Sequence, residues 1–314
     1  MNNVFKQLLR LNLQLMSKKI LVIYYTQSGQ LEDILNNFTA PLVEAGNTVE
    51  KVRVHVDNDY PFPWNGKAFF AVMPDCVLSV PTELKPFQLK ENKYDLIILG
   101  YQAWFLSPSI PVNSILSHPA VKTVLKDTPV VTITGARNMW ISAMERIKKI
   151  LKNSEAKLVG SIALVDKHHN FISFITIFYW MFKGKKERLL NIFPKPGVAD
   201  ADIKNTVLFG ATVQKYLAKE NWDGLQDDLI QQKAIEVKYN LMFIESKASK
   251  IFAIWANIIS KKKKKTAWLV AFKYYLLIAL FIAAPIILTV DFIFFKPFLS
   301  GRIKKQKQHY SSVN

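Results

Sequence analysis

The sequence lacks most of the features that stabilise or anchor small secreted proteins. Cys76 is the only cysteine among 314 residues, so neither a disulfide framework nor a cysteine-based zinc cluster is available, and we expect no metal site. The first fifteen residues have no compact apolar core followed by a small-residue cleavage site, so they do not resemble a signal peptide. Met16 is closely followed by the first predicted strand and would itself be a suitable start. One interpretation is therefore that residues 1–15 are an upstream over-extension of the chain.

Two nucleotide-binding motifs are also absent. The sequence contains no G-x-G-x-x-G, which a dinucleotide fold would need, and no G-x-x-x-x-G-K-[ST], which binds nucleoside triphosphates.

Acidic residues are scarce. Asp and Glu number 24 against 42 Lys and Arg, which gives a formal net charge of +18. Such an excess predicts an anionic partner, either a membrane surface, a nucleic acid or an acidic carrier protein. The positive charge gathers around an apolar C-terminal stretch and not on a nucleic-acid recognition motif, so we expect a membrane partner and no nucleic acid.

The chain is organised around residues 18–36. Residues 20–25 form an apolar run typical of a buried parallel strand, and apolar residues then recur at helical spacing. The loop between them contains Thr26, Ser28, Gly29 and Gln30. Hydroxyl groups, a permissive glycine and a helix N-terminus together predict a phosphate-binding loop. An ordinary strand-to-helix turn capped by Ser28 is the alternative.

This loop resembles the phosphate loop of flavodoxin-like proteins, T-x-[ST]-G-x-T. Thr26, Ser28 and Gly29 match that pattern, whereas Leu31 stands where the last hydroxyl would be.

Further strands and helices alternate along the chain with short connections. This alternation predicts a doubly wound parallel sheet of the flavodoxin-like α/β class, covered by helices on both faces. The expected strands are 48–54, 94–100, 129–134 and 157–165, and the expected helices are 112–125, 141–151 and 198–218. Residues 57–87 are rich in proline and aromatics, and we predict an ordered insertion with one short helix near 66–73.

Ligands of such sheets bind outside the carboxyl ends of the strands, so the loops 26–30, 101–111 and 135–140 should meet. Tyr101 and Trp104 are predicted to contact a flavin ring. Gly135, Arg137 and Asn138 are predicted to stabilise negative charge at the ring's N1–C2 edge. We therefore expect FMN as the cofactor. Core packing of Trp104 and a solvated salt bridge of Arg137 are the alternatives.

Other reactive side chains give weaker signals. Cys76 paired with His168 or His169 would be a nucleophile, but a buried structural thiol is the more ordinary interpretation. His168 is the candidate proton acceptor near the site. The other three histidines, His55, His118 and His309, have no partner visible in the sequence.

The C-terminal half changes character. Residues 171–182 are apolar and aromatic but too short to span a bilayer. They predict either a buried helix, or a membrane-surface helix or hydrophobic substrate wall. Five lysines at 261–265 precede the uncharged run 274–290, which is long enough to span. Basic residues follow this run as well, so a single span and a re-entrant hairpin kinked at Pro285 both stay open. We expect attachment to the cytoplasmic face of the inner membrane.

These patterns divide the chain into four parts. They are an N-terminal extension (1–17), a flavodoxin-like FMN-binding domain (18–220), a helical basic linker (221–266) and a membrane-anchoring segment with a basic tail (267–314).

Five phrases taken together resemble the dialkylresorcinol condensing enzymes of bacterial aryl-polyene (flexirubin-type) pigment clusters. They are VIYYTQSGQL, YPFPWNGKAFF, GYQAWFLSPSIP, TGARNMW and KLVGSIALVD. The resemblance implies a lipophilic substrate and a ketosynthase or acyl-carrier partner. Because no ketosynthase-type Cys/His arrangement is present, a flavin site fits aromatisation better than condensation. The implied reaction oxidises a dialkylcyclohexane-1,3-dione to a dialkylresorcinol, with His168 as candidate base.

Two other functions remain open. A membrane-associated NAD(P)H:quinone oxidoreductase would use the same fold and cofactor. A non-catalytic scaffold for the pigment enzymes would have lost flavin, consistent with Leu31. The sequence leaves open whether the chain forms a homo-oligomer.

Overall fold

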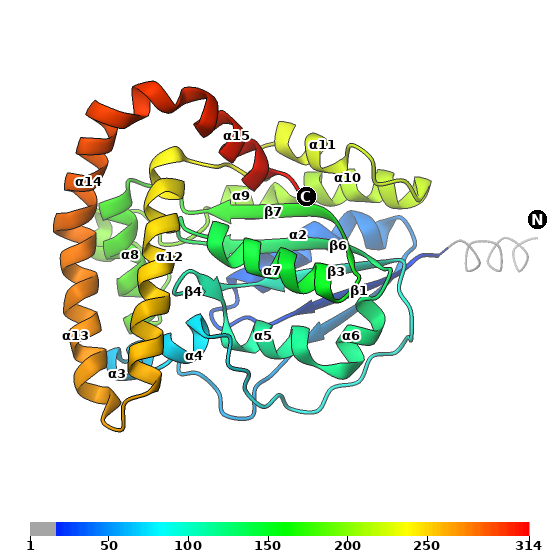
Figure 1. Ribbon diagram of the computed structural model, residues 1–314. Coiled ribbons are helices and arrows are strands. Elements are labelled where there is room, and N and C mark those ends of the chain that lie inside the picture. The colour runs from blue at the N-terminus through cyan, green and yellow to red at the C-terminus, as the bar shows by residue number, and fades with distance from the viewer. Residues whose placement is uncertain (1–16, 314) are drawn as a thin grey trace, which may run out of the picture.

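The computed structural model describes residues 17–313, so the predicted extension 1–17 and the proposed start at Met16 lie almost wholly outside the described residues. Five strands form one parallel sheet in the order β2-β1-β3-β6-β7 (Figure 1). They are β1 (Lys19–Tyr24), β2 (Thr48–Arg53), β3 (Leu96–Tyr101), β6 (Pro129–Ala136) and β7 (Lys157–Val165). In sequence order this is 2-1-3-4-5, which is the flavodoxin-like arrangement. The predicted fold class is confirmed.

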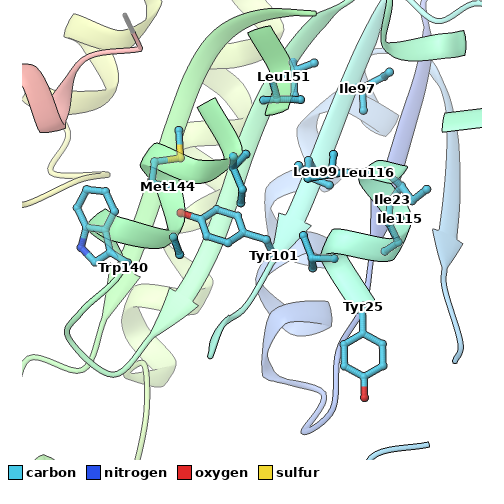
Figure 2. Close-up of a cluster of buried hydrophobic side chains, with 14 of the residues drawn as sticks. Ile23, Tyr25, Ile97, Leu99, Tyr101, Ile115, Leu116, Trp140, Met144 and Leu151 are labelled. Carbon is cyan, nitrogen blue, oxygen red and sulfur yellow. The ribbon is translucent and has the colours of Figure 1, made fainter. Parts of the chain in front are cut away.

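Helices cover both faces of the sheet. One face carries α2 (Gln30–Glu44), α9 (Asp200–Lys204), α10 (Thr206–Lys219) and α11 (Leu225–Gln231). The other carries α5 (Ile110–Ser117), α6 (Pro119–Leu125) and α7 (Ile141–Asn153). Successive side chains of β1 point to opposite faces, Ile20 and Val22 toward α2, and Leu21 and Ile23 toward α5. Figure 2 shows Ile23 beside Ile115 of α5.

The boundaries differ most from the prediction at three places. The expected helix 198–218 is two helices, α9 and α10, which meet at Asn205. The expected helix 112–125 is two helices, because Pro119 disfavours the helical conformation at the residue before it and His118 is extended (φ −68°, ψ 131°). Strand β6 continues through Gly135 and Ala136, which pair with Leu164 and Val165 of β7. These two residues are therefore at the end of a strand and not in the loop.

The insertion 57–87 is ordered and folds over the carboxyl ends of the strands. It contains two short helices, α3 (Gly66–Ala71) and α4 (Met73–Val77), where one was predicted. Asn65 caps α3 by accepting a hydrogen bond from the Ala68 N–H at 2.8 Å. The insertion rejoins the domain through an isolated bridge between Val56 and Leu84.

Residues 221–266, predicted as a helical linker, are helical and pack closely on the sheet domain. Leu225 and Leu229 of α11 are fully buried against the sheet. The long helix α12 (Tyr239–Ser260) crosses the carboxyl-end edge of the sheet and contacts α4 and α7 (Figure 1).

The remaining helices lie along the same edge, except for the last one, which turns back toward β7 (Figure 1). They are α8 (Asn170–Lys183), α13 (Lys265–Ile278), α14 (Ala284–Val290) and α15 (Ser300–Ser311), with π-helical turns over 279–283 and 291–295 and 3-10 turns at Leu189–Asn191 and Lys296–Leu299. Within the described residues, one continuous helical segment, Lys265–Ser311, is apolar and long enough to cross a membrane by length and composition alone.

Glu245 joins α12 to the sheet domain in a pH-dependent way. Its carboxylate is 1% exposed and accepts a hydrogen bond from the Ser142 N–H at 2.7 Å, at the N-terminus of α7. Burial raises the pKa of Glu245 from 4.5 to about 7. Because the folded-state pKa lies above the unfolded value, this group's stabilisation is complete below pH 4.5 and is lost as the pH rises through 7.

We expect Glu245→Gln to remove that pH dependence. At pH 8 the variant should be more stable than the wild type by about 1–3 kcal/mol, and at pH 4.5 the two should be nearly equal. Denaturant unfolding at both pH values measures this difference. A variant that is destabilised more at pH 8 than at pH 4.5 would show instead that the folded protein stabilises the charged carboxylate.

Candidate functional site

A cavity of about 300 Å³ lies at the carboxyl ends of β1, β3 and β6. Three of its walls are the segments 27–31, 102–105 and 135–137, so the three loops that the sequence predicted to meet do meet. The insertion and α8 close the cavity from the other side. Their contributing side chains are mostly aromatic: Phe62, Trp64, Phe69, Phe178 and Trp180. Small-molecule sites in proteins commonly have this size and this mostly apolar lining.

The loop after β1 has the backbone of an anion site. Gly29 has φ +85°, a conformation that favours glycine, and α2 begins at the next residue. No side chain of residues 17–313 caps this helix N-terminus, so its first N–H groups are available beside Ser28, which lines the cavity. Thr26 is turned inward, because its Oγ1 accepts a hydrogen bond from the Gly29 N–H at 3.2 Å. Thr26 thus shapes the loop and does not face the cavity.

Gln30 also differs from its predicted role as a phosphate ligand. Its side-chain amide donates to the Val198 carbonyl at 3.4 Å and accepts from the Val198 N–H at 3.2 Å. This pair of bonds fixes the segment before α9 over the loop. A Cβ at Gly197 would lie 2.9 Å from the amide atoms of Gln30, so the close approach depends on that glycine.

Trp104 lines the cavity as predicted and belongs to an aromatic cluster. Its ring meets Tyr25, Tyr60 and Trp64 edge-on, with centroids 5.2–6.1 Å apart. It stands on a small hairpin formed by β4 (Ala103–Trp104) and β5 (Ser107–Pro108). The cluster is a rigid aromatic wall on which a flat ring can stack.

Tyr101 is a correction to the prediction. Its side chain is fully buried on the α7 face of the sheet, near Met144 and Trp140, and does not line the cavity (Figure 2). The physical reason is the pleat: Tyr101 is the last residue of β3, and its side chain points to the same face as Leu99. Burial raises the pKa of its hydroxyl. Tyr101 is a core residue.

The loop after β6 provides a partly desolvated cation. Arg137 lines the cavity, and its guanidinium donates to the backbone and side-chain oxygens of Asn170 at the start of α8. It also lies 5.5 Å from the centroid of the Phe174 ring. Burial lowers the pKa of Arg137 to about 10, with Asp166 acting in the opposite direction, so the group is a poorly solvated cation at neutral pH.

Asn138 supports Arg137 and does not line the cavity. Its Nδ2 donates to the same Asn170 oxygen. Gly135 does line the cavity, and a Cβ there would lie 3.0 Å from Ile34 Cδ1.

Two buried polar atoms in the cavity wall have no hydrogen-bond partner within residues 17–313. They are the Oε1 acceptor of Gln102 and the Nε donor of Arg137. Buried polar groups are nearly always paired, so an unpaired acceptor and an unpaired donor in one cavity indicate a polar ligand. The sequence pattern did not single out Gln102, although it lies in the second predicted loop, two residues before Trp104.

His168 lies beside the site but not in its lining. Its Nδ1 is 2.6 Å from Asp166 Oδ1, and Asp166 follows β7 directly. The carboxylate fixes the ring orientation and leaves Nε2 as the free position. His168 is thus held by Asp166, and the structure gives it no direct contact with the cavity lining.

The Cys76 thiol is structural. It is fully buried and donates to the carbonyl oxygens of Trp104 and Pro108 at 3.1 and 3.4 Å. Burial raises its pKa, which opposes formation of the thiolate that a nucleophile needs. Within the described residues no group of three His, Cys, Asp or Glu side chains is placed to hold a metal ion.

Comparison of the chain with protein-family models and with curated proteins finds no match. Solved structures of flavoproteins share parts of the arrangement. A flavoprotein in complex with FMN from Lactobacillus acidophilus NCFM is 17% identical, over 47% of this chain and 93% of its own, with a TM-score of 0.39. A flavodoxin from the domain Archaea is 10% identical, over 63% of this chain and 98% of its own, with a TM-score of 0.36. Flavodoxin 1 from Bacillus cereus is 16% identical, over 62% and 95%, with a TM-score of 0.33.

Proposed function

We propose that this chain binds FMN in the cavity at the strand ends and is a membrane-associated oxidoreductase for a lipophilic ring substrate. The main support is the pair of unpaired buried atoms, Gln102 Oε1 and Arg137 Nε, set among aromatic side chains. The pyrimidine edge of a flavin carries an N–H donor and carbonyl acceptors, which are the complements of these two atoms. The uncapped N-terminus of α2 beside Ser28 suits the phosphate.

The residues fit the cofactor with one weakness, which is the phosphate end. The Thr26 hydroxyl is bonded to the Gly29 N–H, the Gln30 amide is bonded to the backbone of Val198, and Leu31 has no hydroxyl. Ser28 and main-chain N–H groups must therefore hold the phosphate. The residues around the proposed position of the flavin ring fit the cofactor better than those at the phosphate. Trp104 supplies an aromatic wall. Arg137 supplies a cation that is already largely buried from water before any ligand binds.

For the substrate we propose a dialkylcyclohexane-1,3-dione, which the resemblance to the aryl-polyene pigment enzymes implies. Conversion to a dialkylresorcinol removes one hydride and one proton from the ring and enolises both carbonyls. Bound FMN supplies the hydride acceptor for this oxidation. The chain's own contributions are an apolar lining from the insertion and α8, which excludes water, and Arg137, which attracts an enolate oxygen.

The test uses the full chain purified in detergent. We expect the absorption bands of oxidised flavin, with FMN released on denaturation, and anaerobic bleaching of one FMN per dione converted. The product should weigh two hydrogen atoms less than the dione. A saturated monoketone of the same chain length is the matched control and should cause no bleaching.

Other results would overturn parts of this proposal. Bleaching by NADPH followed by reoxidation with a quinone, without turnover of the dione, would select a quinone reductase. A protein that stays colourless with added FMN would select a non-catalytic scaffold for the pigment enzymes.

A further inference from the structure

The segment from α13 to the 3-10 turn Lys296–Leu299 exposes a long apolar surface. Large hydrophobic side chains are exposed to solvent along its whole length. Examples, each between 43% and 62% exposed, are Tyr274, Ile278, Phe281, Ile282, Ile286 and Phe292. Such a contiguous surface is rare on proteins surrounded by water and marks an interaction site. We call it the apolar face.

The opposite side of the same segment is packed on protein. Phe272 is fully buried and lies 5.3 Å from the Phe252 ring of α12 and 6.3 Å from Phe105 of the site hairpin, measured between ring centroids. Further along, Asp291 is 3% exposed and accepts a hydrogen bond from the Tyr239 hydroxyl at 2.8 Å. Leu269, Tyr275 and Leu276 are partly buried against the same cluster as Phe272, although only 6% of the segment's most apolar stretch is fully buried. Protein thus covers part of one side of the segment, unlike a lone span that lipid surrounds.

Both ends of the apolar segment return to the same folded domain. Its start is joined to α12 by the turn at 261–264, and α15 folds back toward β7 and α7 (Figure 1). Gln226 of α11 donates to the Ser311 carbonyl at 2.7 Å, and His309 lies 3.3 Å from Glu145 of α7. A single span would place α15 about 30 Å away across the hydrocarbon core and break these contacts.

Charge selects the partner of this surface. Residues 261–314 contain eleven lysines and arginines and one acidic residue, Asp291, which is buried. Five of the lysines stand at 261–265 before the apolar face, and five basic residues follow it between 296 and 307. Basic clusters at both borders of an apolar surface fit an anionic bilayer, whose surface attracts each such residue by about 1 kcal/mol.

The apolar face is continuous with the wall of the cavity. Phe281 on the face stacks with Phe171 of α8 at 6.0 Å and meets Phe174 edge-on at 5.2 Å. Phe174 in turn contacts Phe178, which lines the cavity, at 4.3 Å. A chain of aromatic contacts therefore connects the lining of the cavity with the apolar face.

We propose that the chain is monotopic. The apolar face lies in the plane of an anionic membrane surface, with the sheet domain, residues 261–265 and α15 all on one side of it. Ligands dissolved in the bilayer then reach the cavity laterally, along the phenylalanines of α8. The attachment itself does not rest on the proposed flavin chemistry, whereas the lateral route does.

Single cysteines test the attachment. Cys76 is fully buried, so the wild type serves as the unlabelled control. Lys93→Cys reports the sheet domain, and Lys263→Cys and Lys305→Cys report the two borders of the apolar face; all three positions are exposed. The full chain is expressed in a bacterial host and treated with a membrane-impermeant maleimide in spheroplasts and in inverted inner-membrane vesicles. We expect all three positions to react only in inverted vesicles.

Reaction of Lys305→Cys from the side opposite to Lys93→Cys would establish a single span and overturn the proposal. The lipid preference is measured separately, by flotation of the purified protein with vesicles. We expect at least tenfold more binding to vesicles containing phosphatidylglycerol than to phosphatidylcholine alone, and loss of that preference when Lys261–Lys265 are all changed to Gln. A stable dimer that floats with neither vesicle would assign the apolar face to a second copy of the chain.

These readouts separate the two proposals. Labelling and flotation require no cofactor, so they can succeed with a protein that never binds FMN. For the lateral route, Phe178→Ala should change the KM for a long-chain dione by at least about tenfold more than for a short-chain one, while flotation is unchanged. Equal effects on both chain lengths would reject the route and leave the attachment standing.

Discussion

Arg137→Met is expected to weaken FMN binding by about ten- to a hundredfold. The substitution removes a cation with an unpaired Nε in the cavity wall, and hydrogen bonds to charged groups contribute about 1.5–3 kcal/mol. It also removes the charge that stabilises an anionic reduced ring, so the flavin's midpoint potential should fall by roughly 30 mV or more. Fluorescence titration with FMN and a spectroscopic redox titration measure the two effects.

Two variants keep this prediction falsifiable. Arg146 is also partly buried, with its pKa lowered by burial, but it donates to the Val77 carbonyl and does not line the cavity, so Arg146→Met is the matched control. Arg137→Lys retains the charge and should preserve most of the potential while losing affinity. If Arg146→Met weakens FMN binding as much as Arg137→Met, the effect arises from general destabilisation and Arg137 has no direct role.

Gly210→Ala is expected to cause the largest loss of stability from a single added methyl group. Helix α10 crosses α2 at this glycine, and a Cβ there would lie 1.9 Å from the Phe38 carbonyl oxygen and 2.9 Å from Pro41 Cγ. The obstacle is main chain, so the two helices must separate and disturb the buried cluster between them. We expect a cost of about 3 kcal/mol in the free energy of unfolding, measured by denaturant titration.

Gly66→Ala is the control for Gly210→Ala. Gly66 opens α3, its φ is not positive, and a Cβ there meets nothing within 4 Å. Alanine is the better helix former, so Gly66→Ala should be neutral or stabilising by up to about 1 kcal/mol. The same change thus has opposite signs at the two glycines. A Gly210→Ala protein as stable as the wild type would mean that α10 does not approach α2 this closely.

The sheet was predictable because its signal is local. Each strand is a short apolar run such as Ile97–Leu99, and alternation with helices leaves few topologies for a parallel sheet. The errors at the helix boundaries are also local in origin. Pro119 divides one expected helix into two, and the pairing of Gly135 with Leu164 extends β6 in a way that only the neighbouring strand determines.

The site was predicted less completely because its geometry depends on tertiary contacts. Loop position identified Ser28, Trp104 and Arg137 as lining residues, but it could not give the direction of each side chain. Tyr101 points into the core because of the pleat of β3, and Gln30 is occupied by Val198, which is 168 residues away in the sequence. The apolar composition of 171–182 indicated a substrate wall as one alternative, but only the tertiary structure places the insertion and α8 over the same cavity.

The aromatic wall of the cavity has an optical consequence. Three of the chain's seven tryptophans, Trp64, Trp104 and Trp180, line the place proposed for the flavin. Their fluorescence emission overlaps flavin absorption, so energy transfer would quench the emission of these three tryptophans when a flavin binds. Trp268 lies in α13, close to the lysines 261–265, and is 37% exposed. Its emission would shift to shorter wavelength on contact with lipid, so one unlabelled sample could report cavity occupancy and bilayer contact as separate signals.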